Sequence, residues 1–283
     1  MSFALWRATA AVVALLAFLA VGMALQRVPT ARLTAISRVE YLQLLTMGAF
    51  VAGTTVSLFF AFERTSIATV LIVFYTFPLW VAIAAVPVFG EHLGRDKLIA
   101  IVIAASGLVL LLAAPGAGEA VDITGVLLAL VASFCQVGFA LVGSGGFRSV
   151  PPLQAATLLR SLALAIYGLV LVPVVIVVGQ GATVLDPLGA PVAWALVLAA
   201  GVIGAAIPAV LVIAGYRRVG PTRGAVLMLV EPVTGVVLAA FLLAEQPTWP
   251  RLVGGVLVLA GAALVQRAPV SRPGPETRVA AEP

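Results

Sequence analysis

The sequence predicts an all-α protein that crosses a membrane many times. Of its 283 residues, 63% are hydrophobic and 10% are charged, and the mean hydropathy is +1.20. A water-soluble domain has about 25% charged residues, so this composition excludes a water-soluble globular protein. Backbone polar groups find no water inside a bilayer, and the short alternating segments of a barrel are not seen, so the spans are predicted to be helices.

Nine apolar runs are long enough to cross the hydrocarbon layer as helices. They cover residues 3–25, 41–62, 66–88, 97–114, 122–143, 152–178, 191–214, 221–244 and 250–266. The first run resembles a secretory signal, with Arg7 ahead of an apolar stretch. However, Arg7 and its run match Arg160 and its run at a shift of 153, so we interpret residues 3–25 as a helix of the fold.

Basic loops separate alternate spans and predict the topology. Twelve basic residues lie in or beside one set of loops and the tail: Arg27, Arg32, Arg38, Arg95, Lys97, Arg148, Arg217, Arg218, Arg223, Arg267, Arg272 and Arg278. The other face has three: Arg7, Arg64 and Arg251. The first set is therefore expected on the cytoplasmic side, together with the C-terminus, and the net charge of +5 reflects topology rather than a nucleic-acid partner. The tail at 268–283 is expected to be disordered.

The chain also contains an internal repeat. A shift of 154 places Pro78 on Pro232, Glu91 on Glu245 and Gly107 on Gly261 without a gap. We divide the chain into a first repeat at 1–114 and a second at 121–267. Repeats of five helices would enter the membrane in opposite orientations, which is an architecture of transporters. Duplication without transport is the alternative.

Three sets of segments carry a family resemblance. They are LVEPVTGVVLAAFLLAEQ with LVGGVLVLAGAAL, TFPLWVAIAAVPVFGEHL with LIAIVIAASGLVL, and DITGVLLALVASF from Asp122. These segments resemble the EamA-type repeat of the drug/metabolite transporter superfamily. The resemblance implies two inverted repeats of five helices, transport of small metabolites and a bacterial plasma membrane location. The first repeat lacks its first helix, whose counterpart would lie about 32 residues upstream of Met1, so we expect either a start codon placed too late or a nine-helix protein.

Two charged residues are predicted deep inside spans. Glu231 follows Pro221 by ten residues, about 15 Å into its helix, and Arg160 follows Pro152 by eight, about 12 Å into its own. A charge at the bilayer centre costs at least about 2.5 kcal/mol, so a partner or a function should offset it. Glu231 is a candidate substrate or proton site, or packing glue. Arg160 is a candidate anchor for a carboxylate or phosphate, a partner for Glu231, or an arginine reaching the headgroups.

Prolines mark two further features of these spans. Pro78 and Pro232 lack the N–H group that would bond the carbonyls of Phe74 and Met228, so both helices are expected to kink. Either the kinks serve packing alone, or the freed carbonyls face a cavity. Four polar residues are candidates to line such a cavity: Tyr75, Thr76, Gln136 and Thr234. Four glycines are expected to allow close helix packing: Gly107, Gly254, Gly255 and Gly261.

Several chemistries are missing from the sequence. It contains no phosphate-binding G-x-x-x-x-G-K-[ST] loop, and one histidine with one cysteine offers no metal cluster or nucleophile–base pair. We therefore expect no enzyme and no cofactor. The predicted function is a secondary transporter, exporting amino acids or related polar compounds by alternating access, with membrane lipid, a small-molecule substrate and protons as partners. The alternative is a non-transporting scaffold or small-molecule sensor.

Overall fold

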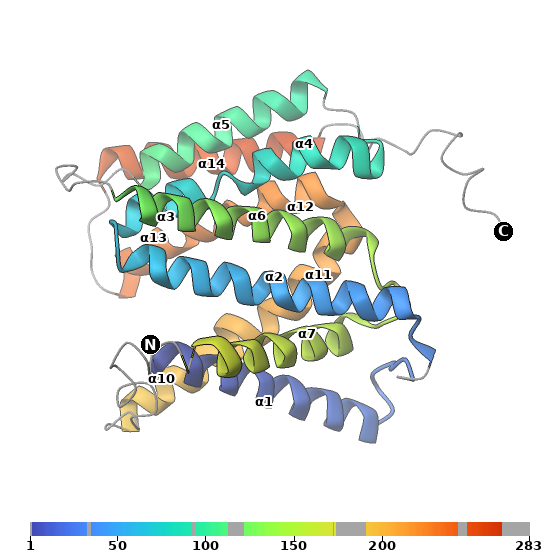
Figure 1. The fold of residues 1–283 in the computed structure, drawn as a ribbon. Coiled ribbons are helices and arrows are strands. Elements are labelled where there is room, and N and C mark those ends of the chain that lie inside the picture. The colour runs from blue at the N-terminus through green and yellow to red at the C-terminus, as the bar shows by residue number, and fades with distance from the viewer. Residues whose placement is uncertain are drawn as a thin grey trace. The chain divides into compact units, whose positions relative to one another are not determined.

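The structure, a computed structural model, describes residues 2–32, 35–91, 94–112, 122–171, 173, 191–242 and 248–267, and all their regular elements are helical (Figure 1). Glu245 and the tail at 268–283 lie outside these residues. Among the described residues, seven helical stretches are long and apolar enough to span a membrane, and Leu252–Val265 is a shorter apolar helix. The predicted fold class, an all-α multi-pass membrane protein, is confirmed.

The helices gather into two compact units, and each unit takes segments from both halves of the sequence. The first unit comprises residues 1–56 and 142–218, and the second comprises residues 57–141 and 219–283. Two helices, α2 (Arg38–Phe62) and α6 (Ile123–Gly145), contribute residues to both units. The chain therefore passes between the units three times, within α2, within α6 and after Arg218.

The first unit is built around α1 (Ser2–Ala24). This helix packs against α7 (Pro152–Ile166), α10 (Pro191–Gly201) and the π-helical segment η3 (Val202–Ala206). The chain continues from η3 into α11 (Ile207–Val219), and α7 continues into a second π-helical segment, η2 (Tyr167–Leu171). The fully buried side chains of this unit include Leu15, Met47, Leu159, Ile213 and Tyr216.

Two tethers hold loops onto this unit. The Gln154 side chain pairs with both backbone groups of Ala31, accepting from its N–H at 2.8 Å and donating to its carbonyl at 2.9 Å. The Arg217 guanidinium donates to the carbonyls of Val150 and Phe147 at 2.8 and 2.9 Å and stacks over the Phe147 ring at 4.6 Å. Because Gln43 accepts from the Phe147 N–H at 2.7 Å, the turn between α6 and α7 is bound from both α2 and α11.

In the second unit, α5 (Arg95–Leu112) and α14 (Trp249–Arg267) lie along each other (Figure 1). A Cβ atom on Gly254 would lie 2.5 Å from the carbonyl oxygen of Gly107, and one on Gly261 would lie 2.6 Å from that of Ala100. The backbones are therefore in direct contact, and the predicted packing role is confirmed for Gly107, Gly254 and Gly261. A Cβ atom on Gly255 would make only ordinary contacts, with Val233 Cγ1 at 3.6 Å.

Two predicted spans of the second unit are each divided into two helices. Residues 66–88 form α3 (Ile67–Phe74) and α4 (Phe77–Phe89), and residues 221–244 contain α12 (Pro221–Met228) and α13 (Val230–Leu242). The breaks lie at residues 75–76 and at 229, which correspond at the repeat shift of 154. Each break begins directly after the carbonyl that the proline leaves without its helical donor.

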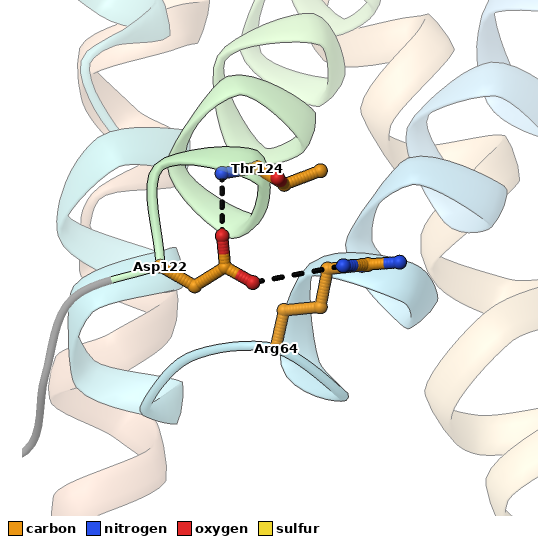
Figure 2. Close-up of polar contacts among 3 residues, drawn as sticks. All are labelled: Arg64, Asp122 and Thr124. Carbon is orange, nitrogen blue, oxygen red and sulfur yellow. Dashed lines mark hydrogen bonds and ion pairs between the residues drawn. The ribbon is translucent and has the colours of Figure 1, made fainter.

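Ion pairs fix the ends of α5 and α6. The Lys97 ammonium in the first turn of α5 donates to Glu91 at 2.8 Å, so this carboxylate bonds a side chain of the helix that follows it. Asp122 accepts from the Thr124 N–H at 2.7 Å at the start of α6 and lies 3.6 Å from the Arg64 guanidinium (Figure 2). The Thr124 N–H, and to a lesser degree Arg64, holds the pKa of Asp122 below its usual range.

Candidate functional site

The predicted polar residues fall into two groups, one in each unit. Tyr75, Thr76, Gln136, Glu231 and Thr234 belong to the second unit, around the two helix breaks and on α6. Arg160 belongs to the first unit, in the middle of α7.

The two helix breaks of the second unit bring a phenol and a carboxylate together. Tyr75 lies in the break between α3 and α4, and Glu231 is the second residue of α13, just after the other break. The Tyr75 hydroxyl lies close enough to the Glu231 carboxylate for the two groups to interact electrostatically. The Tyr75 ring is 8% exposed and packs against Phe74 and Phe77, whereas the Glu231 side chain is exposed. A buried tyrosine thus lies beside an accessible acid.

Thr76 supports the first break from within. Its hydroxyl donates to the carbonyl of Val73 at 2.7 Å and lies 3.3 Å from the Ser133 hydroxyl of α6. The Trp80 indole donates to the Thr76 hydroxyl oxygen at 3.2 Å. Thr76 therefore closes the last turn of α3 and joins it to α6. Its hydroxyl is engaged by groups of the second unit itself.

The remaining candidates of this group show weaker connections. The Thr234 hydroxyl donates to the Val230 carbonyl at 3.0 Å, one turn earlier in α13, and its side chain is exposed. Gln136 is half-buried on α6 and makes no hydrogen bond within the described part of the chain. Pro78 is buried in α4, and Pro232 is half-buried in α13. Tyr75 and Glu231 are the candidates that the structure brings together.

Arg160 lines a pocket inside the first unit. The pocket has a volume of about 20 Å³ open to the centre of a water molecule, and its lining consists of Arg7, Ala8, Ala11, Thr55, Arg160, Ala163, Tyr167 and Ala205. Arg160 Nε is buried and has no hydrogen-bond partner among the described residues. Arg160 therefore faces an internal space of the first unit.

Arg7 is the functional candidate that the sequence did not reveal. It lies on α1, which packs against α7, and it reaches the same pocket as Arg160. The signal that could have found it was the shift of 153 that pairs the two arginines. The match that indicates a helix at residues 3–25 thus also pairs two residues that line one pocket.

Comparisons with known proteins identify the family. The sequence model of the EamA-like transporter family matches residues 1–113 and 123–267. The chain belongs to the EamA-like transporter family. A crystal structure described only as that of a protein is 20% identical, with a TM-score of 0.70 over 93% of this chain and 87% of that chain, and so shares the fold. A search of curated proteins found no match.

This EamA-like transporter is a multi-pass membrane protein that lies in lipid, and its family transports small molecules. Each of the two matched segments contributes one arginine to the pocket, Arg7 from the first and Arg160 from the second. Each also contributes one broken helix and one side of the Tyr75–Glu231 contact. Arg160 and Glu231 belong to different units, and their pairing remains a prediction.

Proposed function

We propose that the chain is a secondary transporter that exports a small polar metabolite, an amino acid or a related compound, by alternating access. Membership of the EamA-like transporter family supports the part of this proposal that concerns transport of small molecules. The observation that supports the rest is the Tyr75–Glu231 contact at two helix breaks related by the repeat. Interrupted helices expose backbone groups and place charged side chains near the bilayer midplane, where secondary transporters bind their cargo.

Glu231 is the proposed coupling residue. Its carboxylate is exposed within reach of the Tyr75 hydroxyl, so it can accept the ammonium group of an amino acid or take up and release a proton. A group that does both in turn exchanges a proton for cargo, which couples export to the proton gradient. The proposed location is the bacterial plasma membrane, with the C-terminus on the cytoplasmic side because the basic loops are placed there.

The test has two stages. Cells overproducing the protein are challenged with a panel of toxic amino-acid and metabolite analogues, and a compound whose toxicity is relieved is then followed in proteoliposomes with and without a pH gradient. We expect Glu231→Gln to lower gradient-driven transport by at least about tenfold, the cost of one charge-assisted hydrogen bond. Glu63→Gln, which changes an exposed acid of the same unit, is the matched control.

Two results would contradict the proposal. Transport that ignores the pH gradient and survives Glu231→Gln would remove the coupling role of this residue. A compound that binds to the purified protein but is never moved across the bilayer would support the scaffold or sensor alternative.

A further inference from the structure

We propose that the pocket between α1, α2, α7 and η3 binds the anionic oxygen group, a carboxylate or a phosphate, of a small soluble cargo, and that Arg7 and Arg160 hold this group together. The proposal names the chemical class of the cargo and in that respect rests on the proposed transport function. The pocket itself lies entirely within the first unit.

The first argument is the charge in the pocket. Two guanidinium groups line one small space, where each raises the electrostatic cost of the other. The described residues of the first unit include one acidic residue, Glu40. It bonds Ser37 and Ser149 at the end of α2 that is far from the pocket. Glu40 precedes Thr55 of the pocket by fifteen residues, about 22 Å along the helix. An oxyanion would supply the negative charge that the pocket lining does not.

The second argument is unused hydrogen-bonding capacity. A guanidinium carries five N–H donors in a planar fork that fits carboxylate and phosphate oxygens. Arg160 Nε is buried without a partner, although a buried donor normally has one. The Tyr167 hydroxyl already donates to Thr55 Oγ1 at 2.8 Å, and Thr55 in turn donates to the Val51 carbonyl at 3.0 Å. These hydroxyl groups brace the wall of the pocket, while the Arg160 donor remains for a ligand.

The third argument is the space and the backbone around it. The alanines of the lining leave about 20 Å³ open, which exceeds the roughly 10–15 Å³ that one water molecule needs, so an oxygen atom of a ligand can enter. Tyr167 opens η2 and Ala205 lies in η3, so π-helical segments flank the pocket on two sides. Such segments cost helix stability and occur frequently at functional sites.

Ligand-induced thermal stabilisation of the purified protein in zwitterionic detergent tests the proposal without requiring transport. The probes are acetate, succinate and inorganic phosphate as sodium salts, with sodium chloride at equal ionic strength as the reference. We expect at least one oxyanion to raise the melting temperature above the chloride reference. Arg7→Gln and Arg160→Gln should each weaken this binding about tenfold to a hundredfold, because each removes a charge-assisted contact.

Matched variants separate a binding role from a structural one. Arg7→Lys and Arg160→Lys keep the charge but lose the fork, so their affinity should fall between the unmodified protein and the Gln variants. Without a ligand, both Gln variants should melt no lower than the unmodified protein, since each removes one of two like charges that share the pocket. Arg64→Gln, which changes an exposed arginine paired with Asp122, should bind oxyanions normally.

Three outcomes would overturn the proposal. The first is equal stabilisation by chloride and by every oxyanion, and the second is oxyanion binding that survives both Gln substitutions. The third is stabilisation that follows only the phosphatidylglycerol content of added vesicles, which would assign the pocket to a lipid headgroup. Oxyanion binding lost in the Gln variants, in a protein that moves no cargo, would support the pocket and contradict only the transport proposal.

Discussion

At the scale of single residues, Asp122 shows how one exposed carboxylate fixes a helix terminus. It accepts the Thr124 N–H at the start of α6 and lies beside Arg64 (Figure 2). Its folded-state pKa is lowered, so its contribution to stability is present above the usual aspartate pKa and is lost as the pH falls through the folded value.

We therefore expect Asp122→Ala to lower the melting temperature at pH 7, and the difference from the unmodified protein to shrink below about pH 4. Thermal unfolding in detergent over a series of pH values measures it. Asp122→Asn keeps an oxygen for the Thr124 N–H and should lose less, because an exposed ion pair contributes little. A deficit that stays constant down to about pH 3 would contradict the role of the ionised carboxylate.

Gln154 supports a prediction about the loop that follows α1. Its amide satisfies both the N–H and the carbonyl of Ala31, and its side chain is 5% exposed. Gln154→Met leaves two backbone groups without partners and should cost about 1–3 kcal/mol of unfolding free energy. Gln136→Met is the control, since Gln136 makes no hydrogen bond within the described part of the chain. Equal losses in the two variants, measured by chemical denaturation, would contradict the tether.

The depth of a charged residue in an apolar span singled out Arg160 and Glu231 as candidates, but it did not single out Arg7. Arg160 and Glu231 stand out because charge is costly inside lipid. Arg7 lies close to the start of its helix, where an arginine is ordinary, so depth does not distinguish it. Its place beside Arg160 depends on the packing of α1 against α7, which the repeat hinted at but could not establish.

At the scale of helices, residues with a strong local effect on the backbone were the predictable ones. Proline removes a donor, and the breaks at residues 75–76 and 229 follow from Pro78 and Pro232. The π-helical segments η2 and η3 were not among the expected features, although Pro173 and Pro208 lack the N–H groups that would bond the carbonyls of Leu169 and Gly204 inside them.

The contact between α5 and α14 carries the prediction at this scale. A Cβ on Gly254 would lie 2.5 Å from both Gly107 O and Leu111 N, so Gly254→Ala must separate the helices and should cost about 1–3 kcal/mol. Gly235→Ala in α13 meets open space and should be neutral or stabilising by up to about 1 kcal/mol. Unfolding free energies of the two variants provide the comparison, and a neutral Gly254→Ala would contradict the close contact.

At the scale of the whole molecule, the order of the helices was readable from apolar runs, and each of the nine runs coincides with described helix over much of its length. Seven of the described helical stretches are long and apolar enough to span a membrane. The units were not readable. The internal repeat suggested halves at 1–114 and 121–267, whereas each compact unit draws on both halves. Repetition in a sequence records its duplication, but packing is decided by which apolar surfaces fit together.

The topology prediction belongs to this scale. With twelve basic residues on one set of loops, the C-terminus should be cytoplasmic. A fluorescent protein that matures only in the cytoplasm, fused after Pro283, should fluoresce, and a phosphatase that needs the periplasm should be inactive in the same position. An active phosphatase fusion would reverse the proposed orientation.

Because each unit contains segments from both halves of the sequence, neither unit can be complete until late in synthesis. The first unit lacks α7, α10 and α11 until translation has passed Arg218, and the second lacks α14 until nearly the end. Helix α1 therefore enters the bilayer before its packing partners α7, α10 and η3 have been made. Ribosome stalling or truncation before that point would leave no finished unit at all.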